Sequence, residues 1–393
     1  MSWPAVEVTE VARVVGGATP KSAIEEFWDG DVNWVTPKDL SNLDGKYIAE
    51  TPRKITAQGL RSCAAELLPA NSVLFSSRAP IGHVAINAEP MATNQGFKSF
   101  VPGPDLDASF LYWWLDANRG YLQSLGTGAT FKEVSKAVVQ RIKIPLPPLE
   151  EQRRIAGILD QADALRRLRT RALDKLNTLG QAIFHEMFGA ALANQFFEFG
   201  KAVEEFRYGT SNKSGDGGLP TLRIPNVIGG GIDTGEIKNV EVTGAELNRL
   251  RLREGDVLFV RTNGNPDYVG RCASFSQDAV AGYGAETDWI FASYLIRARL
   301  SDRINPVFAK TYFASQIGRK AIRERCKTSA GQFNINTEGL SSLPFPDVSR
   351  EQQDRFAETV LEIEKNSAPM KASAEAMERK FSSLQYSAFR GEL

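Results

Sequence analysis

Polar side chains able to read nucleic-acid bases follow two predicted strands, 73–75 and 257–260. They are Arg78 after the first strand, and Arg261, Asn263, Asn265 and Arg271 after the second. Arginine can make paired hydrogen bonds to guanine, and asparagine to adenine, in the major groove of DNA. These loops therefore favour base reading. The alternative is that the asparagines only form turns and the arginines are only solvated.

A second basic group lies where the sequence predicts a helix over 307–327. It contains Arg319, Lys320, Arg323, Arg325 and Lys327, against one acidic residue, Glu324. Arg319, Arg323 and Lys327 are four residues apart, so on a helix they would share one face suited to following phosphates. A solvated face fits equally well. The predicted DNA contacts also include Lys38, Thr130 and Arg223.

The two halves of the chain are not equally basic. The helix predicted over 110–125, which matches 307–327, offers only Arg119. The two halves are therefore expected to bind different DNA.

Residues for catalysis are scarce. His83 and His185 are the only histidines, which leaves almost no material for His-based metal sites or Ser-His-Asp triads. Both are interpreted as structural. No GxxxxGK[ST] loop occurs, so no ATP hydrolysis is expected. Cys63, Cys272 and Cys326 are unclustered, which favours a reducing cytoplasm and argues against zinc.

One string has the form of a catalytic motif. Asn265-Pro266-Asp267-Tyr268 resembles the Asn-Pro-Pro-Tyr loop with which adenine methyltransferases hold a flipped base. Aspartate replaces the second proline, and no glycine-rich S-adenosylmethionine loop lies upstream after a strand. The string is interpreted as a tight turn.

Composition sets the class of protein. The 393 residues suit two domains of roughly 150 residues each with connecting elements. The 47 basic and 47 acidic residues balance, which counts against a nonspecific DNA coat. No apolar run is long enough for a membrane span, and no export signal is read at the start. A cytoplasmic globular protein with no membrane partner is expected.

The elements that must position these residues occur twice, about 200 residues apart. The matching segments, in order, are 11–17 with 203–209, 71–75 with 255–259, 128–131 with 330–333, 145–156 with 346–357, and 179–184 with 384–389. Because the order is the same in both halves, the chain is interpreted as a duplication. Each half runs from β-rich segments through a helix and a proline-marked exit into a long helix.

The long helices show the apolar spacing of a coiled coil. In the second helix the seam is Phe356, Val360, Ile363, Ser367, Met370, Ala374, Met377, Phe381, Leu384 and Ala388. In the first it is Ile155, Ile158, Ala162, Leu165, Leu168, Ala172, Leu176, Leu179, Ile183 and Met187. The steps alternate between four and three without exception in the second helix and nearly do so in the first. This spacing predicts a left-handed seam, so the helices are expected to pair antiparallel. The alternative is that each helix packs on its own domain. A kink or short break is expected at Pro369.

Three segments carry a family resemblance. Residues 27–40 resemble the opening of a target-recognition domain in type I restriction–modification specificity subunits. Residues 143–156 are similar to the family's junction into its central conserved helix, and 384–393 to its usual ending. The likeness covers essentially the whole chain. The segment 349–353 is a weaker copy of the junction.

The resemblance implies an α+β fold with pseudo-two-fold symmetry. Its parts would be target-recognition domain 1 (1–147), a central long helix (148–190), target-recognition domain 2 (191–346) and a distal long helix (347–393). Each recognition domain has a small mixed sheet with helices, and the long helices form an antiparallel coiled coil. Each domain would read one half of a bipartite, asymmetric double-stranded DNA site, while the helices set the unread spacer.

The resemblance also implies a division of labour in which this chain is non-catalytic and needs no cofactor or metal. Two methyltransferase subunits would dock on the helices and bring S-adenosylmethionine, and a motor–nuclease subunit using ATP and magnesium can also join. The implied docking positions are Leu149, Gln152, Ile155, Leu159, Gln353, Phe356 and Val360.

Two other readings stay open at this point. One is a coiled-coil scaffold that does not read DNA, against which the repeated Arg- and Asn-bearing loops argue. The other is a stand-alone adenine DNA methyltransferase, which would need S-adenosylmethionine to bind this chain.

Overall fold

The structure is a computed structural model that describes residues 3–128, 132–284, 287–329 and 331–393. The chain divides into two compact units. Unit 1 consists of Met1–Thr170 with Ala372–Leu393, and unit 2 of Arg171–Lys371. Among the described residues, no helix combines the length and apolar character needed to cross a bilayer. The predicted α+β class is confirmed.

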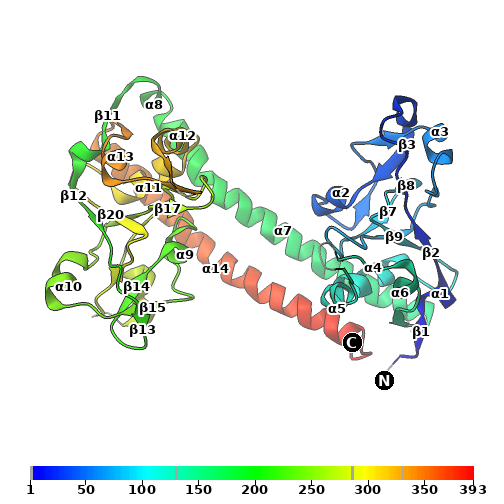
Figure 1. Ribbon diagram of the computed structural model, residues 1–393. Helices are drawn as coiled ribbons and strands as arrows, with labels where there is room; N and C mark the ends of the chain where they lie inside the picture. The colour runs from blue at the N-terminus through cyan, green and yellow to red at the C-terminus, as the bar shows by residue number, and fades with distance from the viewer. Residues whose placement is uncertain (1–2, 129–131, 285–286, 330) are drawn as a thin grey trace. The chain divides into compact units, whose positions relative to one another are not determined.

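Unit 1 contains two sheets and one isolated strand pair (Figure 1). Its strands are β1 (Ala5–Glu7), β2 (Ala12–Gly16), β3 (Trp28–Val35), β4 (Tyr47–Ile48), β5 (Lys54–Ile55), β6 (Val73–Phe75), β7 (Val84–Asn87), β8 (Met91–Thr93), β9 (Lys98–Pro102) and β10 (Lys143–Pro145). The main sheet has the order β2-β9-β6-β7-β4, the smaller sheet is β5-β3-β8, and β1 pairs with β10.

Short helices surround these sheets, and one long helix follows them. They are α1 (Val8–Val11), η1 (Glu25–Phe27), α2 (Pro37–Ser41), α3 (Ala57–Arg61), α4 (Ala108–Ala117), α5 (Arg119–Ser124), α6 (Lys136–Gln140) and the long α7 (Leu149–Phe188). The other long helix, α14 (Arg350–Ala388), contributes its C-terminal part to unit 1.

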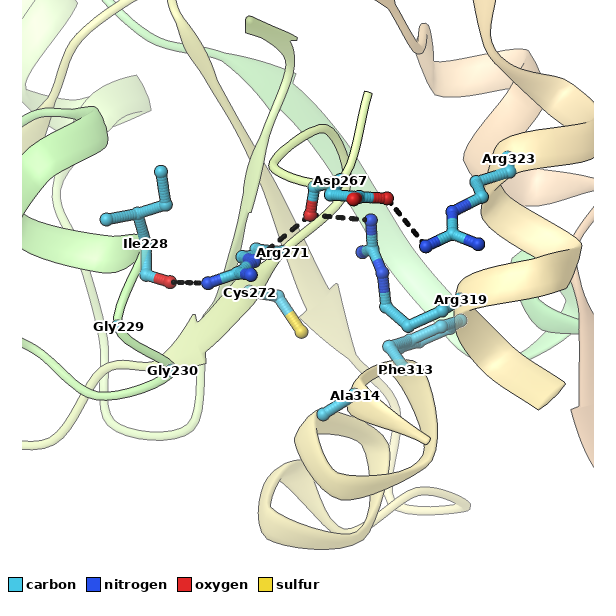
Figure 2. A pocket seen from close by; sticks show the side chains of 10 residues that line it. All are labelled: Ile228, Gly229, Gly230, Asp267, Arg271, Cys272, Phe313, Ala314, Arg319 and Arg323. Carbon is cyan, nitrogen blue, oxygen red and sulfur yellow. Dashed lines mark hydrogen bonds and ion pairs between the residues drawn. The ribbon is translucent and has the colours of Figure 1, made fainter. Parts of the chain in front are cut away.

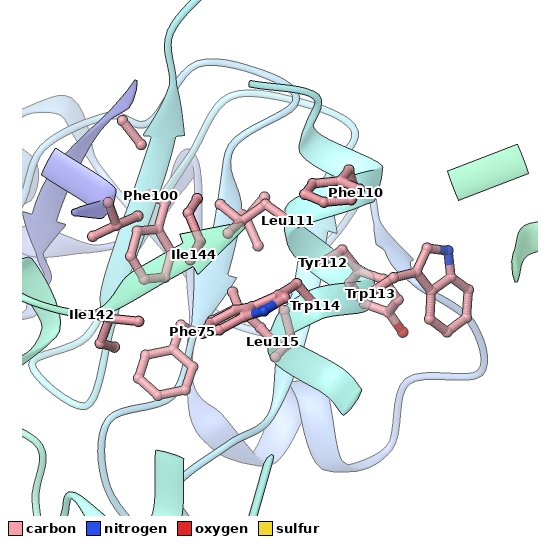
Figure 3. Close-up of a cluster of buried hydrophobic side chains, with 14 of the residues drawn as sticks. Phe75, Phe100, Phe110, Leu111, Tyr112, Trp113, Trp114, Leu115, Ile142 and Ile144 are labelled. Atoms are coloured by element: carbon pink, nitrogen blue, oxygen red, sulfur yellow. The ribbon is translucent and has the colours of Figure 1, made fainter. Parts of the chain in front are cut away.

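The main hydrophobic cluster of unit 1 combines aromatic and aliphatic side chains (Figure 3). Helix α4 buries the consecutive residues Phe110 to Leu115. Phe75 and Phe100 meet them from the main sheet, with ring centroids 6.2 Å apart. Ile155 of α7 and Phe381 of α14 belong to the same cluster. Both long helices are therefore part of the hydrophobic core.

Unit 2 repeats this plan with a further small sheet. Its strands are β11 (Phe196–Glu198), β12 (Val203–Tyr208), β13 (Ser214–Gly215), β14 (Leu219–Leu222), β15 (Lys238–Val240), β16 (Val257–Val260), β17 (Thr262–Asn263), β18 (Cys272–Ser274), β19 (Ile290–Phe291), β20 (Leu295–Leu300), β21 (Lys327–Ser329), β22 (Gln332–Asn334) and β23 (Pro344–Pro346). Its shorter helices are α8 (Ala191–Asn194), η2 (Phe199–Ala202), α9 (Ile224–Val227), α10 (Gly244–Leu250), η3 (Asp278–Tyr283), α11 (Pro306–Ala314), α12 (Gln316–Arg325) and α13 (Thr337–Ser341).

The strand orders of the two units correspond. The run β2-β9-β6-β7 in unit 1 recurs as β12-β20-β16-β18 in unit 2, antiparallel throughout. The parallel pair β3·β8 recurs as β14·β19, and β1·β10 recurs as β11·β23. The third sheet of unit 2 has the order β17-β22-β21. The predicted duplication is confirmed in the topology.

The helix that follows each main sheet is broken, contrary to prediction. The sequence predicts single helices over 110–125 and 307–327. The structure has two helices in each segment: α4 and α5 are separated at Asn118, and α11 and α12 at Ser315. The Ser315 hydroxyl accepts a hydrogen bond from the Gly318 amide at 3.2 Å and caps α12. The Asn118 side chain donates to the Trp114 carbonyl at 2.8 Å. Such local side-chain bonds compete with helix continuation.

The seam predicted for the second long helix is confirmed, because all its positions in α14 are buried or half-buried. The seam predicted for α7 is only partly formed, because six of its ten positions are buried or half-buried and four are exposed. Leu165, Leu168, Leu179 and Met187 are exposed. The fully buried positions of α7 include the predicted Ile155 and the positions Gln152, Ala156, Leu159, Asp163, Phe184 and Phe188, which the predicted seam left out. The prediction followed the leucines and missed Asp163, a charge that can be buried because neighbouring arginines pair with it.

The long helices run antiparallel and in contact. The pairs of facing residues, in order along α7, are Arg166 with Glu378 and Arg169 with Ser373 in unit 1, then Gly180 with Val360 and Phe184 with Phe356 in unit 2. Numbers rise along α7 as they fall along α14 within each unit. The expected antiparallel pairing is therefore confirmed.

Helix α14 passes Pro369 without a break. Proline removes one backbone donor from a helix, which is why a kink or break was expected. Ser367 is buried and Met370 half-buried on either side of it. We attribute the continuity to this packing.

Candidate nucleic-acid interface

The loop that follows β16 in unit 2 is built from successive side-chain turns. The Asn263 Oδ1 accepts a hydrogen bond from the Asn265 amide at 2.9 Å, and the Asn265 Oδ1 accepts one from the Asp267 amide at 2.9 Å. The turn-forming role of these asparagines is therefore real. It occupies an acceptor oxygen of each side chain.

Three arginines converge on Asp267 in this loop (Figure 2). Arg271 Nε and Arg319 Nη2 donate to its backbone carbonyl at 3.0 and 3.1 Å. Arg323 Nη2 lies 2.6 Å from its carboxylate oxygen Oδ1. A second bond joins Arg319 Nη2 to the Val269 carbonyl at 2.7 Å. Asp267, the residue that departs from the Asn-Pro-Pro-Tyr pattern, thus pins the loop to helix α12.

A cavity of about 340 Å³ opens beside this cluster. Arg271, Arg319 and Arg323 line it together with the Ile228–Gly230 turn. Figure 2 shows Arg271 between this turn and Asp267, with its Nη1 donating to the Ile228 carbonyl at 3.3 Å. Three guanidinium groups face one carboxylate, so the lining carries an excess of positive charge. Burial lowers the pKa of Arg319, and its Nη1 is buried without a hydrogen-bond partner among the described residues. The cluster is suited to an anionic group such as a phosphate.

The basic face predicted over 319–327 is only partly formed. Arg319 and Arg323 share α12, but Lys327 lies in strand β21, because the helix ends at Arg325. Lys320 is exposed on α12. The single helical face of Arg319, Arg323 and Lys327 is therefore wrong, although the first two do lie together.

Two other predicted arginines have partners elsewhere in unit 2. Arg261 Nη1 donates to the Ser293 carbonyl at 3.3 Å, and its guanidinium lies 4.8 Å from the Tyr208 ring centre. Arg223 precedes α9 and pairs with Glu236 at 3.1 Å. The structure does not join either residue directly to the Asp267 cluster.

Residues Thr262, Asn334 and Lys327 stand side by side across the β17-β22-β21 sheet. Thr262 is in register with Asn334, and Asn334 with Lys327. The Thr262 hydroxyl donates to Gln332 Oε1 at 3.0 Å. The sequence interpretation included Lys327 but missed Thr262 and Asn334. The alternation of polar residues in 332–334 was the available signal.

Unit 1 carries fewer basic residues in its corresponding loop. Arg78 pairs with Glu133 at 3.6 Å, and Lys98 pairs with the same carboxylate at 3.2 Å. Lys38 is exposed on α2. Thr130 lies outside the described residues.

The helix positions expected to dock a partner are used within the chain itself. Gln152, Ile155, Leu159, Gln353, Phe356 and Val360 are all buried, and Leu149 is half-buried. A buried side chain has no surface to offer, so we correct the docking role of these six residues to core packing. Leu165 and Leu168 of α7 are exposed, although the sequence analysis placed them in the seam between the long helices.

Comparisons with known proteins agree with this architecture. Residues 2–178 match the family described as the type I restriction modification DNA specificity domain. The chain is 34% identical over 188 residues to the type I restriction enzyme MjaIX specificity subunit of Methanocaldococcus jannaschii, covering 47% of this chain and 44% of that protein. It is 26% identical over 366 residues to the type I restriction enzyme EcoKI specificity subunit of Escherichia coli, covering 86% of this chain and 77% of that one.

Solved structures show the same fold. The crystal structure of the type I restriction–modification S subunit from M. genitalium superposes with a TM-score of 0.57 at 14% identity, covering 99% of this chain and 96% of that one. A chain described under complex assembly and conformational transition of the type I restriction–modification system also gives 0.57, at 17% identity, covering 100% and 98%.

Two repeated units with unlike polar loops, each holding parts of one antiparallel helix pair, define a duplicated DNA-specificity protein. Residues 2–178 carry the DNA specificity domain of type I restriction–modification systems, and the whole chain has the fold of the S subunits of these systems.

Proposed function

We propose that this chain reads a bipartite, asymmetric double-stranded DNA site, one half with the recognition domain 1–147 and the other with 191–346. One observation carries the proposal. The units repeat one strand order, yet the loops after β6 and β16 bear different side chains. Like scaffolds with unlike polar loops suit two readers of different sequence.

The segments 148–190 and 347–393 set the spacer between the half-sites in this proposal. Support comes from α7 and α14, each of which is a single uninterrupted helix. Each helix contributes residues to both units. A continuous helix resists bending better than a loop and suits a fixed spacing.

The arginines around Asp267 supply phosphate contacts that set register, with Lys320 as a further contact. Phosphate contacts position a protein on DNA without reading sequence. Arg78, Arg261, Asn263, Asn265 and Lys327 would contact bases or adjacent phosphates, and Lys38 and Arg223 would add contacts at the edges.

Two adenine methyltransferase subunits dock on the long helices and supply S-adenosylmethionine, and a motor–nuclease subunit using ATP and magnesium joins to cut unmodified DNA. Exposed apolar side chains on these helices support docking there. Leu165 and Leu168 are 58% and 61% exposed in unit 1, and Leu361 is 50% exposed in unit 2.

The decisive experiment selects bound sequences from random double-stranded DNA with this chain assembled with methyltransferase subunits of its source organism. Two short conserved blocks separated by a fixed unread gap are expected. A single block, or bound DNA with no shared sequence, would contradict the proposal. Exchanging residues 1–145 for those of another family member should then change only one block.

A further inference from the structure

The polar row across the third sheet of unit 2 has a counterpart in unit 1. In unit 2 the row is Thr262, Asn334 and Lys327, one residue from each of β17, β22 and β21. In unit 1, Arg78 bridges Glu133, and Glu133 bridges Thr127. Both rows thus consist of a central residue paired with one residue on each side.

Backbone hydrogen bonds show that these rows occupy equivalent places. The Val134 amide donates to the Ser77 carbonyl at 2.9 Å in unit 1, and the Ile335 amide donates to the Arg261 carbonyl at 3.0 Å in unit 2. Each bond lies one residue from the row. A side-chain-capped helix follows directly in both units, α6 after Ser135 and α13 after Asn336.

One face of the unit 2 sheet is committed to the core. Phe333 packs against the main hydrophobic cluster of unit 2. Residues directly opposite each other across strands point to the same face, and successive residues alternate. Asn334 and its row partners therefore point to the other face, with Gln332. That face is polar along the described part of the sheet.

The two rows match in exposure but differ in chemistry. Arg78 and Glu133 are half-buried and Thr127 is exposed, while Thr262 and Asn334 are half-buried and Lys327 is exposed. Arginine and lysine suit guanine, asparagine suits adenine, and glutamate accepts from the cytosine amino group. The major groove of DNA admits a β-ribbon. One scaffold thus presents two different sets of base-reading groups.

We propose that these rows determine the two half-sites, with Arg78, Glu133 and Thr127 reading one and Thr262, Asn334 and Lys327 reading the other. The inference rests on the proposed function, and it names the residues that carry specificity. In unit 1 the ion pair of Arg78 with Glu133 holds both side chains in place, with Lys98 on the same carboxylate. In unit 2 a hydrogen bond from the Thr262 hydroxyl to Gln332 Oε1 holds the Thr262 side chain in place.

The test transplants the row within the full chain, assembled with methyltransferase subunits. The variant carries Thr262→Arg, Asn334→Glu and Lys327→Thr. Selection from random double-stranded DNA should then show the half-site of unit 1 unchanged and that of unit 2 altered towards it. The control makes the same kinds of substitution outside this sheet, as Thr359→Arg, Asn248→Glu and Lys213→Thr, at exposed positions of unit 2. The control should keep both half-sites.

A transplanted variant that binds tightly with both half-sites unaltered would overturn the inference and leave the proposed function standing. A wild-type complex that selects no sequence would instead defeat the proposed function. If the transplanted variant does not fold, Lys327→Ala decides, because Lys327 is exposed. It should lower discrimination at one base pair of one half-site by about tenfold. Unchanged discrimination there would also overturn the inference.

Discussion

Gln152 and Gln353 make the same three hydrogen bonds at the beginning of the two long helices. In each case Oε1 accepts from one backbone amide and Nε2 donates to two carbonyls. The partners of Gln152 are the Asp107 amide at 2.8 Å and the carbonyls of Asp105 and Pro147, both at 2.9 Å. Those of Gln353 are the Asn305 amide at 2.9 Å and the carbonyls of Arg303 at 3.1 Å and Val348 at 2.9 Å.

These glutamines join α7 to the beginning of α4 and α14 to the beginning of α11. Asp107 and Asn305 are the N-caps of α4 and α11. Both glutamine side chains are buried. Each therefore ties a long helix to a recognition scaffold through bonds that water does not weaken.

Gln152→Leu should destabilise the protein by about 2 kcal/mol or more, because it leaves buried backbone groups without partners. The measurement is urea unfolding followed by circular dichroism. Gln161→Leu is the control, since Gln161 is exposed on the same helix. Equal stability of the two variants would show that these bonds contribute nothing. Gln353→Leu, with the exposed Gln352→Leu as control, repeats the test in unit 2.

The sequence predicts elements whose signal is local or repeated. The duplication, the two long helices and their antiparallel pairing follow from matching segments and apolar spacing, and the structure agrees. The seam of α7 could be read only in part from apolar spacing, because it includes the buried polar residues Asp163 and Gln152. Asp163 pairs with Arg166 and Arg167 on the same helix, whereas Gln152 accepts a hydrogen bond from the Asp107 amide, far away in the sequence. The breaks at Asn118 and Ser315 likewise depend on side-chain bonds that apolar spacing does not register.

The sequence predicted which types of residue form the candidate nucleic-acid interface better than it predicted which of them contact one another. Arg319 and Arg323 do lie together, but Asp267, which holds them, was interpreted only as part of a turn. The pairing of Thr262 with Asn334 joins residues far apart in the chain. A sequence without aligned relatives carries no signal for such a contact.

A buried arginine makes the stability of unit 2 depend on pH. Arg297 is 1% exposed and pairs with Glu205. A hydrogen bond from Arg207 and the charge of Arg297 lower the pKa of Glu205 despite its partial burial. The folded state therefore favours the charged carboxylate. Its contribution is complete above the unfolded pKa of about 4.3 and is lost as the pH falls through the lower folded value.

Glu205→Gln should therefore reduce stability at neutral pH, by at most about 3 kcal/mol, because Asp256 still lies near Arg297. The variant should also show a weaker fall in stability below about pH 4 than the wild type. Unfolding measured across acidic pH checks both effects. Parallel pH profiles for the two proteins would rule out this role for Glu205.

Arg323→Ala should weaken DNA binding by a similar factor on specific and random sequences, because the cluster around Asp267 is proposed to contact phosphates. The slope of log affinity against log salt concentration should fall by about 1. Titration of labelled duplexes at several salt concentrations measures both. A loss confined to the specific sequence would instead make Arg323 a base contact. Arg355→Ala, at an exposed arginine of α14 in the same unit, is the control.

Leu165→Asp with Leu168→Asp should weaken assembly with methyltransferase subunits while leaving the fold intact, because both leucines are exposed. Assembly is measured by size-exclusion chromatography of the mixed subunits, and folding by thermal unfolding. The exposed polar position Gln161→Asp on the same helix provides the control. Normal assembly of the double variant would place the docking surface elsewhere.

Lengthening both long helices should lengthen the unread spacer and leave the half-sites unchanged. The chain passes from one unit to the other near Thr170 in α7 and near Lys371 in α14. An insertion of seven residues at each of these points lengthens each helix by about 10 Å. That length corresponds to roughly three base pairs of DNA. Insertion of seven residues keeps the apolar seam in phase, whereas insertion of five would rotate it out of register and should abolish assembly. Mapping adenine methylation across a genome reads the spacer directly, and a spacer that stays the same after the seven-residue insertion would show that the helices do not set it.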